Sequence, residues 1–153
     1  MDGFDTHELE EFERDLLSIA STKMPRESKK FLKKSATKLT KVNKNTFKSS
    51  GAAAGSGATE DEMLKRFKAG KVYKYNGDLN CRAYSGHPLT HLLDLGFIHK
   101  GGRGKKGVKG SKTGDETWVE GYHFMEKSKD SFDDRHYMDT QNFIEDMLRN
   151  NGL

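Results

Sequence analysis

Apolar residues recur at helical spacing in two stretches of the first third of the chain. The first stretch predicts an amphipathic helix over about 5–21. Its apolar positions are Leu9, Phe12, Leu16 and Ile19. We expect Met24-Pro25 to end this helix, because proline lacks an amide proton and suits the first position of a new helix. A narrow apolar stripe that ends at Phe47 predicts a second helix over about 26–48.

The chain then changes from periodic residues to small ones. Residues 49–62, "SSGAAAGSGATEDE", are typical of a flexible connection. Thr59 precedes three acidic residues and is predicted to cap a short helix that ends near Phe67 or Lys68.

Alternating residues over 70–86 predict a β-hairpin around an Asn-Gly dipeptide. A two-residue type I′ turn would place Lys74 opposite Leu79, whereas a three-residue bulged loop would place Tyr73 there. We predict the bulged register because it pairs an apolar side chain with another, and a one-residue slip exchanges the two faces of a strand.

The last third of the chain is predicted to hold one more strand pair and two short helices. The apolar block at 87–101 predicts a helical turn followed by a strand near 93–99, and 116–124 predicts an extended segment. The two amphipathic helices are expected over about 124–134 and 138–150. The side chains expected in the core are Leu93, Phe97 and Trp118.

These elements predict a single α+β domain. N-terminal helices precede a small antiparallel β-sheet with a long basic Gly-rich loop, and C-terminal helices follow. The chain has 153 residues, of which 33% are hydrophobic and 33% are charged, so its core is thin and contact with further copies would add burial. It has no run of about 18 apolar residues, and its acidic start is unlike a signal peptide, so we expect a cytosolic chain.

Charge is segregated along the chain. Residues 2–15 hold seven acids and one base, and residues 23–48 hold ten bases and one acid. Residues 99–114 hold six bases and no acid, whereas 115–149 hold ten acids and four bases. These segments are either solvated faces or complementary faces through which one copy contacts the next. The lysines of the second helix either bind a polyanion or lie beside the apolar stripe with their ammonium groups in water.

The basic loop at 99–114 does not have the context of a nucleotide site. Its Gly102–Gly107 segment fits the spacing G-x-G-x-x-G, but the sequence that follows is too rich in glycine to form the helix that a dinucleotide site needs. Ser111 stands where a phosphate-binding loop has glycine. We interpret the loop as an insertion between two structural blocks.

Other chemistry-bearing residues favour structural roles. Cys81 is the single cysteine, so no intramolecular disulfide forms, and its place in an alternating strand predicts a small core residue. His87 and His91 are four residues apart, but Pro88 stands where a zinc-helix motif has glutamate, and packing or capping roles are favoured. We therefore expect no enzymatic activity, no metal and no cofactor.

Two sequence blocks carry a family resemblance. They are "HLLDLGF" at 91–97 and "WVEGYHFM" at 118–125, separated by the basic loop and preceded by the lysine-rich helix and the hairpin. In this order they resemble the tail-component, tail-completion or head–tail joining (neck) proteins of tailed bacteriophages, over about 26–149. Asp94 departs from the glutamate usual in that family, and the connection lacks the usual Thr-Gly.

The resemblance implies a structural α+β virion protein without enzymatic activity. It divides the chain into an acidic N-terminal helix at 1–24 and a tail-completion-like domain at 25–153. The implied protein is a cyclic homo-oligomer, six- or twelvefold, that is made in the host bacterial cytoplasm. In the virion neck it would join the connector or stopper of the DNA-filled head to the tail terminator or tube. The alternatives are a tail terminator or a small basic nucleic-acid-binding protein, the latter favoured by a pI near 9.0.

The candidate functional residues form two sets. Candidates for assembly or DNA-channel contacts are Lys100, Arg103, Lys105, Lys106, Lys109, Lys112, Lys30 and Lys34. The structural motif comprises His91, Leu93, Gly96, Trp118, Gly121 and His123. Within it, Gly96 is expected to allow a turn or a close backbone approach, and Gly121 a bend. His91 and His123 are expected to hydrogen-bond to the backbone near these bends.

Overall fold

The first helical segment is continuous through the position where we predicted a break. In the computed structural model, which describes residues 7–54, 56–99 and 116–152, α1 (His7–Ser18) passes through a π-helical segment (Ile19–Lys23) into α2 (Met24–Ser50). The prediction that the helix ends at Met24-Pro25 is therefore wrong, because the helix changes type there and continues. Pro25 lies in the first turn of α2, close to the position predicted for it.

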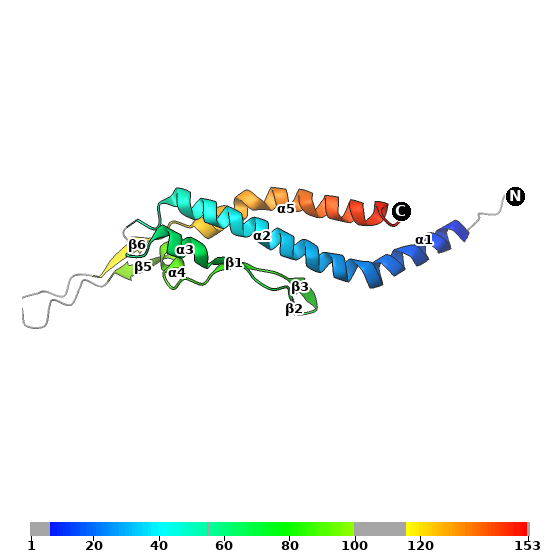
Figure 1. Ribbon diagram of the computed structural model, residues 1–153, viewed down its shortest axis with the longest axis horizontal. Helices are drawn as coiled ribbons and strands as arrows, with labels where there is room; N and C mark the ends of the chain where they lie inside the picture. Colours follow the sequence, from blue (N-terminus) through cyan, green and yellow to red (C-terminus); the bar gives the residue numbers. More distant parts are fainter. Residues whose placement is uncertain (1–6, 55, 100–115, 153) are drawn as a thin grey trace, which may run out of the picture.

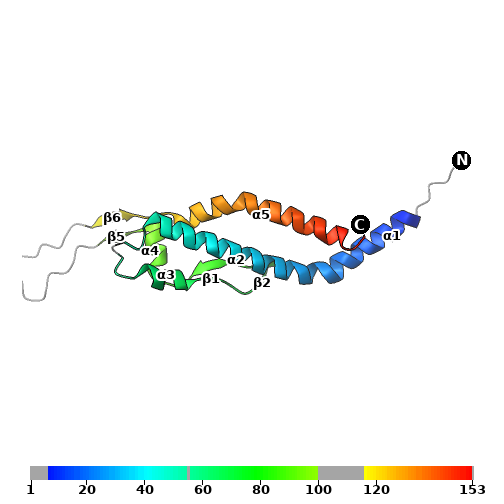
Figure 2. The same ribbon diagram turned by 45° about the horizontal axis from the view of Figure 1, so that its top comes forward.

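Two long helices form the body of the molecule. Figure 1 shows α5 (Phe124–Arg149) alongside α2, with the strands of residues 67–85 on the other side of α2. The turned view in Figure 2 gives the same arrangement, and α1 extends beyond the helix pair at one end. The α+β fold class is thus confirmed.

The prediction of two C-terminal helices is wrong, because α5 is a single helix of 26 residues. The sequence between the two predicted helices contains no glycine or proline. His136, which lies in that interval, shares a hydrogen bond of 2.8 Å with Ser35 Oγ of α2 and stacks between Phe31 and Phe132. Packing against α2 therefore continues through the region where we expected a gap.

The core lies where α2 ends and α5 begins. Phe47 of α2, Phe67 and Phe124 form an aromatic cluster with ring centroids 5.2 to 6.3 Å apart. Ala52 is fully buried in the same cluster, although it belongs to the stretch that we predicted to be a flexible connection. The side chains that complete the cluster are Met63 and Leu64. A methyl group at position 52 is small enough to let the turn after α2 fold back onto the aromatic rings.

The short helix α3 (Glu60–Arg66) begins at the predicted cap. Glu62 N donates to Thr59 Oγ1, and Thr59 N donates back to the Glu62 carboxylate, so both residues satisfy amides that the helix leaves unpaired. The hydrogen bonds from Thr59 also lower the pKa of Glu62.

The chain between α3 and α4 forms a two-stranded ribbon. At the base of the ribbon, β1 (Phe67–Ala69) pairs with β4 (Ala83–Ser85). At its tip, β2 (Tyr73–Tyr75) pairs with β3 (Asp78–Asn80). Residues 70–72 oppose only two residues on the other strand, so a bulge separates base from tip. The ribbon is fastened to α2 by Lys33 Nζ, which donates to the carbonyls of Ala69 and Gly70 at 3.0 and 2.6 Å.

The predicted register of the hairpin tip is wrong. Lys74 lies opposite Leu79, as a two-residue turn requires. Asn76 and Gly77 both have positive φ values, 49° and 89°, which is the conformation of a type I′ turn. All three residues of β2 are exposed, so burial does not select a face and the turn residues alone set the register.

Cys81, which we expected in the core, is half-buried.

The second strand pair follows α4 (Thr90–Leu95). β5 (Gly96–His99) pairs with β6 (Thr117–Glu120), with Phe97 opposite Val119 and Ile98 opposite Trp118. Phe97 and Val119 line a groove of about 290 Å³ together with Leu93. Ile98 and Trp118 point to the opposite face of the strands, and Trp118 is 56% exposed. The prediction of Trp118 as a core residue is wrong, and Leu93 and Phe97 are half-buried.

Two glycines let the backbone of α4 meet the segment after β6. Gly96 has φ 95°, and a Cβ there would lie 2.6 Å from the Val119 carbonyl oxygen, so the predicted turn with close approach is confirmed. A Cβ on Gly121 would lie 2.2 Å from the Asp94 carbonyl oxygen. Gly121 therefore serves close approach, while His123, with φ 51°, makes the left-handed bend that we expected at Gly121.

We predict that Gly121→Ala destabilises the fold by about 1–3 kcal/mol, because the added methyl group would overlap backbone that has no room to move. Urea unfolding would measure this change. Gly86→Ala is the matched control, since a Cβ at Gly86 meets no atom within 4 Å. Equal stability of the two variants would contradict the close approach at Gly121.

Candidate assembly surfaces

Asp94 joins α4 to the start of α5. Its carbonyl oxygen accepts from His123 N at 2.9 Å, and its carboxylate oxygen Oδ1 accepts from Met125 N at 2.9 Å. Leu93 O accepts from Tyr122 N at 2.8 Å in the same way. The His123 side chain does not cap α5, so the Asp94 carboxylate fills that role from another element. We did not predict this role from the sequence, although an acid in the last turn of a helix opposes the helix dipole and therefore indicates a role outside that helix.

The histidines of the structural motif behave differently from our expectation. His123 Nε2 bonds to the Glu120 carboxylate at 3.1 Å rather than to the backbone. Trp118 Nε1 donates to the same carboxylate at 2.8 Å, and these two bonds, that from Trp118 first, lower the pKa of Glu120. His91 is exposed. His87 Nδ1 accepts from Leu89 N at 3.2 Å in the turn that precedes α4. In the described ranges, no three His, Cys, Asp or Glu side chains gather as a metal site would need.

Six of the eight lysines of α2 belong to two groups, and Lys29 and Lys44 to neither. Lys33 and Lys38 bond to the ribbon and to α5, and thus serve the fold. The others that project to solvent on one side of the helix are Lys30, Lys34, Lys41 and Lys48. Their spacing of four and seven residues places them on one stripe. Lys30 also pairs with Glu27 at 2.7 Å. The remaining candidates, Lys100, Arg103, Lys105, Lys106, Lys109 and Lys112, lie outside the described residues.

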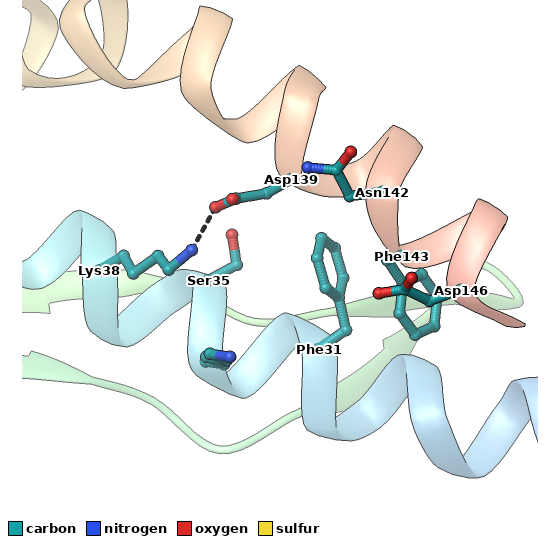
Figure 3. A pocket seen from close by; sticks show the side chains of 8 residues that line it. Phe31, Ser35, Lys38, Asp139, Asn142, Phe143 and Asp146 are labelled. Atoms are coloured by element: carbon teal, nitrogen blue, oxygen red, sulfur yellow. Dashed lines mark hydrogen bonds and ion pairs between the residues drawn. The ribbon is translucent and has the colours of Figure 1, made fainter.

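A groove of about 230 Å³ runs between α2 and α5, and Figure 3 shows its lining. Phe31 and Phe143 stack with centroids 4.6 Å apart. Lys38 of α2 forms an ion pair with Asp139 of α5, and this hydrogen bond is the main cause of the lowered pKa of Asp139. The groove therefore brings together charges of both signs, and its contacts fix the alignment of the two helices.

Apolar side chains are exposed at both ends of the molecule. On α1 none of the residues is buried, and Leu9 and Leu17 are each 62% exposed. At the other end, where Figure 1 places β5 and β6, Ile98 and Trp118 are 54% and 56% exposed. The described residues therefore leave apolar side chains uncovered at both ends of the molecule.

Comparisons of the chain with protein-family models, with curated proteins and with solved structures gave no match. Among the described residues, no helix combines the length and the apolar character that crossing a membrane requires.

Replacing Asp94 by alanine is predicted to cost about 1 kcal/mol of unfolding free energy, because the first turn of α5 loses its cap. Asp94→Asn is the control, since an asparagine side-chain oxygen can accept the same bond. Chemical denaturation would compare the three chains. A loss as large in Asp94→Asn as in Asp94→Ala would show that the bond to Met125 N is not what matters.

The pair between Lys38 and Asp139 predicts a pH dependence. Because the folded-state pKa of Asp139 is lowered, its contribution to stability is present above the ordinary pKa of 3.8 and is lost as pH falls through the lowered value. In Lys38→Met the pKa of Asp139 should rise toward 3.8, as NMR titration of the carboxyl carbon would show. Lys34→Met removes a cation from the same groove without removing the bond, and should leave the Asp139 pKa lowered.

Proposed function

We propose that this chain is a structural subunit of a tailed-bacteriophage virion, a neck or tail-completion protein. Copies of the chain associate head to tail into a six- or twelvefold ring, which joins the connector or stopper of the DNA-filled head to the tail terminator or tube. The order of the sequence blocks at 91–97 and 118–125 supports this class.

The observation that carries the proposal is the uncovered apolar stripe of α1. α1 is the end of a long continuous helix that extends beyond the α2–α5 pair, and helices in proteins are stabilised mostly by packing of an apolar face. The described part of this chain buries no residue of α1. A neighbouring subunit would supply the missing contact, as subunits of a ring do for one another.

The charge distribution supports association between copies. α1 carries five acids against one arginine, whereas the solvent-facing side of α2 carries a stripe of lysines. Opposite charges on separate surfaces select the partner and its register more than they add affinity.

The second candidate, a nucleic-acid-binding protein, is favoured by the same lysine stripe. Four lysines on one side of α2 would neutralise phosphates without reading sequence. A ring subunit could also present this stripe to DNA in its channel, so DNA binding that accompanies assembly is compatible with the first proposal. DNA binding by a chain that stays monomeric favours the second.

Sedimentation velocity tests the proposed self-association. We expect oligomers at about 0.05 M NaCl that dissociate progressively toward about 1 M, because salt screens the contacts between acidic and basic surfaces. A chain that remains monomeric at every salt and protein concentration would contradict a ring. The class of protein is tested by electron microscopy of phage particles that lack this chain, which should show full heads and tails that are not joined.

A further inference from the structure

The ribbon carries an exposed face of aromatic and cationic side chains. The Arg82 guanidinium lies 5.8 Å from the ring centroid of Tyr73 and 5.9 Å from that of Tyr84, so all three side chains share one face. Tyr75 shares this face with Tyr73, because alternate residues of a strand point the same way. The three tyrosines are 43%, 42% and 66% exposed, in the order Tyr73, Tyr84, Tyr75. We call these four residues the tyrosine–arginine face.

This face is not used by the fold. The ribbon is held to α2 through Lys33 and through the burial of Phe67, and the tyrosine–arginine face contributes to neither. Tyrosine and arginine are the side chains most enriched at protein interfaces, because they combine apolar area with hydrogen-bonding groups. On this face Lys68 lies opposite Tyr84 and the acid Asp78 lies opposite Tyr75, whereas Lys74 points to the other face of the ribbon.

α1 has the complementary surface. Leu9, Phe12 and Leu16 follow one side of the helix at spacings of three and four residues. Asp15 and Glu13 lie on the two flanks of this stripe, and Glu8 adds a third carboxylate. The result is an apolar stripe bordered by negative charge, which fits the aromatic part of the face beside its two cations, Arg82 and Lys68.

The stripe is short enough to lie within this face. From Leu9 to Leu16 it spans about 10 Å at 1.5 Å per residue. The tyrosine–arginine face extends from the level of Lys68, which pairs with Tyr84, to Tyr75, about 23 Å along the strand.

We propose that α1 of one copy of this chain lies on the tyrosine–arginine face of a second copy, an inference that rests on the self-association in the proposed function. Leu9, Phe12 and Leu16 contact the tyrosine rings, and the flanking carboxylates face Arg82 and Lys68. The contact is between copies because α1 extends past the tip of its own ribbon in both views (Figures 1 and 2). Pairing of α1 with α1 is disfavoured by its five acids.

This contact is heterologous, since each copy gives a helix and receives one on a different surface. Two kinds of disabled chain therefore make a sharp test. Leu9→Ser with Phe12→Ser removes the helix stripe and keeps the ribbon, whereas Tyr73→Ser with Arg82→Glu removes the ribbon face and keeps the helix. Every altered side chain is exposed, so circular dichroism and urea unfolding should match the wild-type chain.

Each disabled chain alone should sediment as a monomer under conditions where the wild-type chain assembles, with association weakened by about 30-fold or more. An equimolar mixture of the two should form a one-to-one heterodimer and nothing larger, because one intact helix and one intact ribbon face remain. The matched control is Arg135→Glu with Tyr137→Ser on α5, which alters an exposed arginine and an exposed tyrosine and should assemble as the wild type does.

Three results would overturn the proposal. Disabled chains that assemble as well as the wild type would refute this contact while leaving the proposed ring in place. A wild-type chain that never assembles would refute the ring and the contact together. If the ribbon variant assembles normally but loses binding of a fluorescent DNA duplex or of oligo-dT, the tyrosine–arginine face binds nucleic acid instead.

Discussion

The close contact of backbone at Gly96 and Gly121 is the constraint on which the rest of the structure depends. It lets the chain leave β6 directly against the end of α4, so that Asp94 can accept from the first amides of α5. Phe124 then enters the aromatic cluster with Phe47, and α5 is directed back along α2. Without this close approach, α5 would not begin beside the end of α2, and the groove between the two helices would not form.

The sequence predicted the elements better than their packing. Periodicity located α1 and α2, and Thr59 and the Asn-Gly turn behaved as their local chemistry requires. The hairpin register failed because we inferred it from the pairing of apolar side chains, whereas all three residues of β2 are exposed and the turn sets the register. The continuity of α5 was missed because His136 packs through a contact with Ser35 that no local pattern reveals. Trp118 was expected in the core, although its strand position turns it outward.

The candidate residues were predictable to a similar extent. Exposure of Lys30 and Lys34 followed from helical spacing, and so did their separation from the apolar stripe. Spacing did not indicate that Lys33 and Lys38 reach other elements, since their partners are distant in sequence. The tyrosine–arginine face was also missed, because it depends on the bulge at 70–72 that brings Arg82 beside Tyr73.

The π-helical segment at Ile19–Lys23 determines which way α1 faces. A π turn accommodates about one more residue than an α turn, so everything before it is rotated by about 100° relative to an uninterrupted helix. The direction in which the Leu9 and Phe12 side chains point therefore depends on the number of residues in the π turn and not on their identity. A related chain with one residue more or fewer in this segment would keep a continuous helix, but its apolar stripe would face another direction. An insertion or deletion here would therefore change which surface α1 contacts without changing any residue of the contact.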